Sequence, residues 1–433
     1  MPTPSASVPE SSALPAGATG HAAGSAIRHK VPLSRPLRHA RYRQLWLANM
    51  VSNLGTWIQA FASAWLVASL SQSPSITSLV QTATYLPVFL FALLAGVVAD
   101  AVDRPRFLFF CNLFMALCAA VMALLASTGK VASEAVLAIT FCLGIGTAFT
   151  WPAWQAAMSG LVEPNEVEAA ATLNTLSYNL SAIIGPALGG ILFGLIGPGA
   201  LFLANALSFA GLLGVYRAWW RANKLQTGLQ TGPQAGFAER FRVGIRTAFG
   251  CARYCRILRN VCWVFFSTIA FAGLLPVFVR DVLRMQSGTY GMLMGCLGGG
   301  AVLAAFFLPQ LRARVDKAGL LAGAMAVYGL MLAAMASSRS LLLLVPLVLC
   351  GGMAWSATVS TLNAAAQLSF PDAVRARTLS IYLFVMSGGY AAGSLFWGQV
   401  ADRWGVRAAL GGASACVLAN AALLLAGNRK NPL

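Results

Sequence analysis

The sequence predicts an all-α integral membrane protein in which twelve transmembrane helices form two pseudo-symmetric six-helix bundles. Of the 433 residues, 58% are hydrophobic and only 10% are charged, whereas about a quarter of a typical soluble chain is charged. Apolar stretches of about 20 residues, the length that crosses the hydrocarbon core of a bilayer, recur along the chain. The two halves of the chain also resemble one another.

The predicted spans follow one another with short connections. The first six cover about 45–70, 76–99, 107–127, 135–158, 169–196 and 200–219, and the second six about 260–283, 290–310, 318–337, 341–364, 378–401 and 406–427. Short turns such as "GPGA" at 197–200 separate most of them. Such turns force consecutive helices to run antiparallel, which favours a helical bundle.

Five segments follow from these spans. We expect a disordered basic cytoplasmic tail (1–43), an N-terminal bundle (44–220), a cytoplasmic linker (221–259), a C-terminal bundle (260–427) and a short cytoplasmic tail (428–433). Residues 1–27 are rich in Ser, Ala, Pro and Gly and lack the apolar core of a secretory signal. In the linker, arginines alternate with Phe241, Ile245 and Phe249, which predicts an amphipathic helix on the membrane surface. A solvated linker is the alternative.

The net charge of +18 is carried between the apolar runs. With the N-terminus in the cytoplasm, 24 of the 30 Lys and Arg residues fall in cytoplasmic segments, as the positive-inside rule requires. We therefore expect a multi-pass protein of the inner (plasma) membrane with both termini cytoplasmic. The loop after the fourth span is an exception, because it contains Glu163, Glu166 and Glu168 and no basic residue. No nucleic-acid module accompanies the charge, so nucleic acid is not an expected partner.

The internal repeat is clearest in the fifth and eleventh spans. Aligning "SAIIGPALGG" with "GYAAGSLFWG" places Gly185 opposite Gly393 at an offset of 208 residues. Ser181 then falls opposite Gly389, and Gly190 opposite Gly398. Two six-helix halves related in this way are typical of transporters built from parallel repeats.

Several motifs resemble one known family over residues 38–427. They are "YRQLWLANMVSNLGTW" at 42–57, "GVVADAVDRPR" at 96–106, "WPAWQAAMSGLVEPNEVEAAATLNTLSYNL" at 151–180 and "GPALGGILFGLIGPGALFLANALSF" at 185–209. The chain resembles the major facilitator superfamily, and within it the transmembrane secretion effector branch of enterobactin and macrolide exporters. The resemblance implies the major facilitator fold and proton-coupled secondary transport by alternating access.

The charged hairpin between the second and third spans is the first candidate site. A carboxylate at a helix end can interact with the positive N-terminus of another helix or with an arginine. The resemblance implies that Asp100 latches the outward-facing state in this way against the start of the eleventh span. The positive-inside rule alone is sufficient to explain Arg106. The complete latch set is Gly96, Asp100, Asp103, Arg104, Arg106, Arg375 and Arg377.

The fifth span resembles the antiporter motif of the superfamily. Its residues are Gly185, Pro186, Gly189 and Gly190, to which the repeat adds Gly393, while Thr172 and Ser181 replace the first two glycines of the motif. A kinked helix with a face of small residues packs closely and seals the cavity on one side, which favours export. A plain close helix crossing is the alternative.

The resemblance places spans one, four, seven and ten around the substrate cavity. Their uncharged polar and aromatic residues suit an amphiphilic substrate that is neutral or weakly charged. For each amide, a hydrogen bond between helices is the alternative role. The candidates are Asn53, Thr56, Gln59, Trp151, Trp154, Gln155, Trp355, Asn363 and Gln367.

Ionisable residues avoid the span centres. All twelve Asp and Glu residues lie in tails, loops or span ends, so the expected coupling ion, H+, has no obvious intramembrane carrier. Asp100 and Asp281 are the available candidates for it. No histidine lies in a span, and the nine cysteines lack the spacing of metal ligands. We therefore expect no metal, no cofactor and no enzymatic activity.

The leading hypothesis is a monomeric secondary active transporter embedded in the lipid bilayer. We expect it to export a small amphiphilic molecule, such as a siderophore, drug or secondary metabolite. A lipid or lysolipid transporter and a non-transporting receptor are the alternatives, since folds are readily reused.

Overall fold

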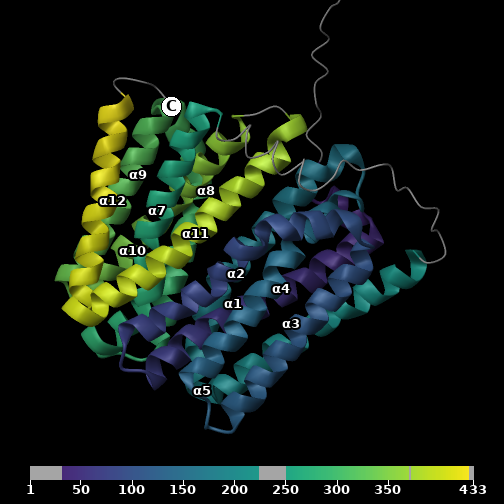
Figure 1. Cartoon of the computed structure of the whole chain (residues 1–433), viewed down its shortest axis with the longest axis horizontal. Coiled ribbons are helices and arrows are strands. Elements are labelled where there is room, and N and C mark those ends of the chain that lie inside the picture. The colour runs from purple at the N-terminus through teal and green to yellow at the C-terminus, as the bar shows by residue number, and fades with distance from the viewer. Residues whose placement is uncertain (1–31, 224–249, 370–371, 429–433) are drawn as a thin grey trace, which may run out of the picture.

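Residues 32–223, 250–369 and 372–428 are described by the computed structural model, and they fold into helices without strands (Figure 1). The N-terminal half contains α1 (Ala40–Leu70), α2 (Pro74–Ala101), α3 (Arg104–Ser127), α4 (Ser133–Ser159) and α5 (Val167–Asn223). The C-terminal half contains α7 (Ala252–Val277), α8 (Ser287–Arg314), α9 (Lys317–Ser337), α10 (Leu341–Gln367), α11 (Asp372–Trp404) and α12 (Val406–Asn428). Three short helical segments join them: η1 (Arg35–Arg38), η2 (Pro164–Glu166) and the π-helix η3 (Phe278–Val282).

Twelve crossings follow from these helices. Ten described helices are long and apolar enough to cross a membrane. One of them, α5, contains two crossings, because Gly197 at φ 78 and ψ 169 divides it into arms 167–196 and 198–223. Helix α1 is not among the ten, since Asn53 and Gln59 lower its hydropathy, but it is 31 residues long. The predicted fold class is confirmed.

Side chains and prolines define several helix starts. Ser73, Asp103 and Asp316 are N-caps, whose side chains accept hydrogen bonds from the backbone N–H groups of Ile76, Arg106 and Gly319. Such caps satisfy backbone donors that have no partner inside the helix. Proline also occupies the first turn of α2 and α3, where its missing N–H is harmless.

The structure differs from the predicted segments at two places. Residues 32–43, expected in the disordered tail, contain η1 and the start of α1, because Tyr42 is fully buried and its hydroxyl donates to the Ala170 carbonyl (3.1 Å). Residues 252–259, expected in the linker, form the first turns of α7, where buried Tyr254 and Ile257 anchor them. The rest of the predicted amphipathic helix, with Phe241, Ile245 and Phe249, lies outside the described residues.

The two halves use equivalent helix pairs. Helix α1 packs against the first arm of α5 as α7 packs against α11, and α2 packs against α4 as α8 packs against α10. Likewise, α3 packs against the second arm of α5 as α9 packs against α12. Two further pairs, α2 with α11 and α5 with α8, join the halves and are related to one another by the same symmetry. The repeat seen in the sequence is therefore a repeat of packing.

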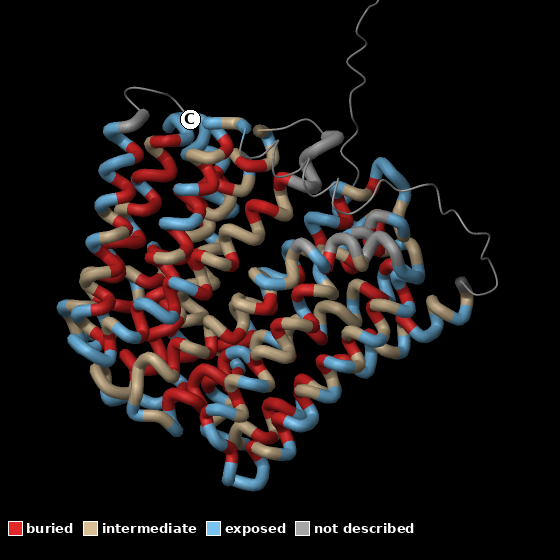
Figure 2. The backbone as a smooth tube through the Cα atoms, in the orientation of Figure 1, coloured by how far each residue is buried: buried red, intermediate tan, exposed pale blue. Residues whose placement is uncertain are grey.

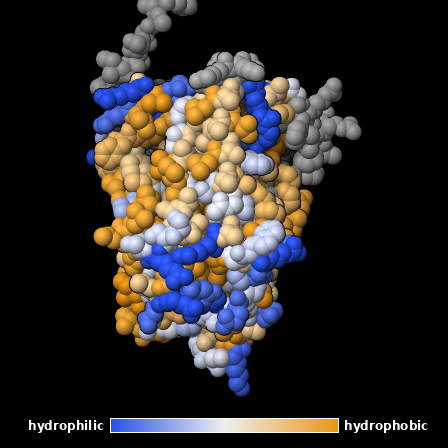
Figure 3. Space-filling model, turned by 90° about the vertical axis from the view of Figure 1, so that its left-hand side faces the viewer, coloured by the Kyte–Doolittle hydropathy of each residue, from blue (hydrophilic) through white to orange (hydrophobic). Residues whose placement is uncertain are grey.

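We name the side where α1 begins and α12 ends the terminal face, and the opposite side the distal face. The halves meet toward the distal face and diverge toward the terminal face, which lies uppermost in Figure 1. Buried residues run along the inward sides of the helices (Figure 2). The middle of the C-terminal half presents a largely hydrophobic outer surface, with hydrophilic residues nearer its upper and lower ends (Figure 3), as a bilayer requires.

Candidate functional site

Helices α5 and α8 close the first of two inter-half contacts at the distal face. A Cβ on Gly190 would lie 2.9 Å from the Ser287 carbonyl oxygen and 3.0 Å from the Gly291 Cα. A Cβ on Gly291 would lie 2.6 Å from the Pro186 carbonyl oxygen. The Ser287 hydroxyl donates to the Gly190 carbonyl at 3.0 Å. Only glycine at both positions permits this approach.

Aromatic rings extend the same contact to α1. Tyr290 of α8 stacks on Phe61 at 4.6 Å and on Trp65 at 5.7 Å between ring centroids. All three side chains are buried. The distal ends of α1, α5 and α8 therefore form one packed unit across the two halves.

Helices α2 and α11 form the second inter-half contact. The Ser394 hydroxyl donates to the Ser78 carbonyl at 2.5 Å, and the Thr82 hydroxyl donates to the Ala391 carbonyl at 3.2 Å. Gly398 faces α2, since a Cβ there would lie 2.9 Å from the Ser75 Cα. Gly398 thus occupies in α11 the role that Gly190 has in α5, as the repeat alignment predicts.

At the distal end of this contact, Asp402 of α11 caps the N-terminus of α2. Its carboxylate accepts hydrogen bonds from the Ser75 backbone N–H (3.2 Å) and from the Ser73 hydroxyl (3.1 and 3.0 Å). The positive end of the α2 dipole favours a negative charge here. The Arg280 guanidinium adds a donor to the Ser71 carbonyl at 2.6 Å and pairs with the Asp281 carboxylate.

Asp402 was not among the predicted site residues, although the sequence contains a signal for it. "GVVAD" at 96–100 ends α2, and "GQVAD" at 398–402 occurs at the end of α11. These two helices run antiparallel against one another. Each helix therefore ends in an aspartate: Asp402 lies beside the start of α2 at the distal face, and Asp100 occupies the matching sequence position at the terminal end of α2.

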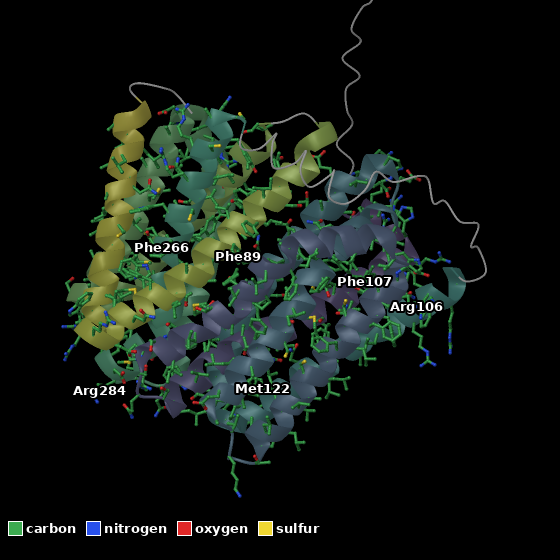
Figure 4. The ribbon with its side chains drawn as sticks, viewed as in Figure 1. Phe89, Arg106, Phe107, Met122, Phe266 and Arg284 are labelled. Carbon is green, nitrogen blue, oxygen red and sulfur yellow. The ribbon has the colours of Figure 1, made fainter. Side chains whose placement is uncertain are left out.

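An aromatic cluster lies deeper between the halves and was also not predicted. Tyr85 stacks on Tyr390 at 4.3 Å, and Phe89 stacks on Phe384 at 4.3 Å. Trp355, a predicted cavity residue, packs edge-on against Phe265 at 5.4 Å. Figure 4 shows Phe89 at the boundary between the two halves. Sequence spacing within one helix cannot indicate such pairs, because the two members of each pair come from different helices.

The antiporter-like residues lie on two sides of α5. A Cβ on Gly185 would meet Trp57 of α1 at 2.5 Å, and a Cβ on Gly189 would meet Phe61 of α1 at 2.8 Å. Pro186 and Gly190 instead face α8. Gly393 packs on Phe266 of α7, which repeats the contact of Gly185 with α1. The motif thus joins α5 both to its own half and to the other half.

The latch residues are only partly within the described structure. The side chains of Asp100, Arg375 and Arg377 lie outside it, and so do the surroundings of Gly96, although α2 and α11 place these positions at the terminal face. Asp103 accepts a hydrogen bond from the Arg106 backbone N–H at 3.4 Å, and Arg104 is exposed.

Arg106 points to the aromatic residues of the N-terminal half. Its guanidinium lies 5.9 Å from the Phe110 ring centroid and 5.4 Å from that of Trp220. These rings belong to α3 and to the second arm of α5. Cation–π contacts of this kind anchor the end of α3 at the membrane surface.

The predicted cavity residues divide into exposed and packed groups. Thr56, Trp151 and Gln155 are exposed, and Asn53 is half-buried. Gln59 is buried and accepts a hydrogen bond from Asn205, and Trp154 packs in the core of the N-terminal half. Asn363 and Gln367 hydrogen-bond to one another at 3.1 Å along α10.

A polar face of α5 adds residues that the sequence analysis did not select. Thr172, Thr175 and Asn179 lie on this face at helical spacing and are exposed. Asn179 lies near the middle of the first arm of α5, where a polar side chain is costly against lipid. The spacing of three and four residues was the available signal.

Glu166 explains the acidic loop that departs from the positive-inside rule. Its carboxylate is 2% exposed and pairs with Arg35 (2.8 Å) and His39 (2.7 Å) of the N-terminal segment. Burial raises the pKa of Glu166, but the hydrogen bond and charge of His39 and the charge of Arg35 act oppositely, and the pKa is lowered overall. The cations missing from the loop sequence are supplied by residues 35–39.

Among the described residues, no group of three or more His, Cys, Asp or Glu residues is placed to hold a metal ion. In the same residues, carboxylates occur at helix ends or in connections.

Comparisons with known proteins agree with this geometry. The family model described as "transmembrane secretion effector" matches residues 32–430. The chain is 22% identical over 357 residues to the staphyloferrin A transporter of Staphylococcus aureus, covering 82% of this chain and 87% of that one. It is 24% identical over 378 residues to the multidrug efflux pump Tap of Mycolicibacterium fortuitum, covering 83% and 89%. A bacterial homologue of the iron transporter ferroportin, solved in an inward-facing state, superimposes with a TM-score of 0.69 at 15% identity, covering 89% and 98%.

Proposed function

Because the chain belongs to the transmembrane secretion effector family of the major facilitator superfamily, we propose that it exports a small amphiphilic molecule by alternating access. The main support is that two helix pairs, α2 with α11 and α5 with α8, close the distal face, while the halves diverge at the terminal face. Two bundles joined by glycine-lined contacts at one face can rock about a site between them. The arrangement corresponds to an inward-facing state if the terminal face is cytoplasmic.

The charge distribution supports that orientation. The positive-inside rule places the segments that hold 24 of the 30 Lys and Arg residues in the cytoplasm. The described parts of these segments lie at the terminal face, among them Arg35, Arg104 and Arg253. The distal face, which is closed, is then the outer side of the plasma membrane.

The substrate path that we propose runs between the halves from the terminal face. Exposed Thr56 and Gln155 and the Thr172–Asn179 face of α5 provide hydrogen-bonding groups. The stacked rings of Tyr85, Phe89 and their partners in α11 form its distal limit. An uncharged polar and aromatic lining suits amphiphilic molecules such as siderophores, drugs or secondary metabolites.

The α2–α11 pair supplies the switch in this proposal. Asp402 holds the distal ends together in the inward-facing state, and Asp100 holds the terminal ends together in the outward-facing state. Each latch combines a carboxylate with the N-terminus of the partner helix. Rocking breaks one latch as it makes the other, and a proton gradient biases the exchange.

Transport into inverted membrane vesicles tests the proposal. Hoechst 33342 and radiolabelled erythromycin serve as amphiphilic probes, and an acidic vesicle interior supplies the gradient. We expect gradient-dependent accumulation that the replacement Gly190→Val abolishes. Accumulation at the same rate without a gradient would exclude proton antiport. Absence of accumulation for all amphiphiles, combined with movement of labelled lipid, would replace export by lipid transport.

A further inference from the structure

A pocket lies at the terminal end of the C-terminal half, away from the boundary between the halves. It is lined by residues of α7 (Arg253, Ile257, Asn260), of α9 (Lys317, Leu321) and of α10 (Thr361, Leu362, Ala365), together with Leu368 directly after α10. Helix α9 packs against α10 and α12, on the side of this half turned away from the N-terminal half (Figure 1). The pocket is therefore separate from the proposed substrate path.

The entrance of the pocket is cationic. Arg253 is the second residue of α7 and Lys317 is the first of α9, and both side chains are exposed. Among the described residues that line it, none carries a carboxylate. The nearby Asp316 carboxylate accepts a hydrogen bond from the Gly319 backbone N–H at 3.3 Å, at the start of its own helix.

The floor of the pocket contains a hydroxyl that lacks a partner. Asn260 and Thr361 lie about two turns, or about 11 Å, inward from Arg253 and Leu368, and each is only 8% exposed. Within the described residues, the Thr361 Oγ1 atom has no hydrogen-bond partner. A threonine in a helix normally donates to a carbonyl of the preceding turn, so this hydroxyl is available to a ligand.

Size and lining indicate the chemical class of the ligand. The volume open to the centre of a water molecule is about 40 Å³, which holds about three water-sized groups and excludes a drug-sized molecule. Two cations at the rim and a hydroxyl in the floor fit a tetrahedral phosphate, which accepts hydrogen bonds on several oxygens. Ile257, Leu321 and Leu362 provide apolar surface beside it.

We propose that this pocket binds a phosphate group, with Arg253 and Lys317 pairing with its charge and Thr361 donating a hydrogen bond. Two sources carry such a group at this depth: the headgroup of an anionic phospholipid and free phosphate. The apolar lining favours the phospholipid, whose glycerol region would cover Ile257 and Leu321. Basic pockets between membrane helices commonly hold anionic headgroups.

Native mass spectrometry of the full-length protein tests this site. The protein is titrated in neutral detergent with phosphatidylglycerol, phosphatidylcholine or inorganic phosphate. We expect one tightly bound phosphatidylglycerol and little phosphatidylcholine. Displacement by millimolar phosphate would identify free phosphate as the ligand of the same site. Binding of neither would overturn the proposal.

Three variants distinguish specific binding in this pocket from nonspecific attraction of an anionic lipid to surface cations. Arg253→Gln combined with Lys317→Gln should weaken phosphatidylglycerol binding at least tenfold, and Thr361→Val about threefold to tenfold. Arg259→Gln removes an exposed cation of α7 that does not line the pocket and should change binding less than twofold. Equal losses in all variants, or full binding by the Arg253 and Lys317 double variant, would contradict the site. Thr361→Val keeps the side-chain shape, so its thermal midpoint checks folding.

Discussion

Two carboxylates, those of Glu166 and Asp402, are stabilised by partners from distant parts of the chain. Glu166 is buried at the terminal face because Arg35 and His39 neutralise it. Asp402 lies at the distal face, where the N-terminus of α2 provides its partners. Both residues join segments that are far apart in the chain, so their partners could not be deduced from local sequence. The acidic loop was visible as an exception to the positive-inside rule, but the cations that compensate it were not.

The first prediction concerns pH and the Glu166 pair. The pKa of Glu166 is lowered in the folded protein. The ionised Glu166 carboxylate therefore stabilises the folded state above its ordinary pKa of 4.5, and this stabilisation is lost as the pH falls through the lowered pKa. A nitroxide at Ser34 should be immobile between pH 5 and 8 and mobile at lower pH. Glu166→Gln should make it mobile throughout, and the control Glu163→Gln, whose carboxylate is exposed, should not. An immobile label in Glu166→Gln would refute the pairing.

The second prediction concerns Asp402. Replacing it by Ala removes a charge and the hydrogen bonds at the start of α2, which is worth about 0.5–2 kcal/mol. We expect a cysteine at Thr82, between α2 and α11, to react with maleimide about twofold to thirtyfold faster in a background without native cysteines. Arg403→Gln is the matched control at the adjacent exposed position. An unchanged rate in Asp402→Ala would show that the carboxylate does not hold the distal face closed.

Most spans were found from sequence because hydrophobic length is a property of each segment alone, whereas the starts of α1 and α7 lie several residues before the predicted ones. Local sequence also predicted, to within a few residues, the turn in α5 at Gly197 and the starts of α2, α3 and α9. The side that a polar residue faces could not be predicted from sequence, because it depends on how the neighbouring helices pack. Gln59 and Trp154 shared the pattern of cavity residues, yet both are buried within the N-terminal half. The aromatic cluster of α2 and α11 required the contact between halves to be known.

The third prediction concerns the α5–α8 crossing. Gly190→Ala places a Cβ within 3.0 Å of backbone atoms of α8, and overpacking of this kind costs about 1–3 kcal/mol. We expect the ratio of distal-closed to distal-open protein to fall about fivefold to 150-fold. The rate of maleimide labelling of a cysteine at Thr82 measures this ratio. Gly194→Ala is the control, because its Cβ would meet its nearest neighbour at 3.9 Å. Equal effects of the two replacements would mean that the close contact does not govern closure.

At the scale of the whole molecule, one pseudo-symmetry organises fold and gates together. The glycine that lets α5 approach α8 and the glycine that lets α11 approach α2 are related by the repeat offset seen in the sequence. The two helices that end in matching "GxVAD" segments are also the pair that spans the halves. A rigid rotation of one bundle must therefore affect both faces in opposite senses.

The central claim, that the two faces open alternately, is tested most directly by paired distance measurements between spin labels. One pair joins Gln72 and Trp404 across the distal face, and the other joins Arg104 and Leu368 across the terminal face; all four positions are exposed. We predict a short distal and a long terminal distance in the wild-type protein. In Asp402→Ala, a long distal population should appear together with an equal short terminal population. A distal distance that lengthens while the terminal distance stays unchanged would contradict alternating access.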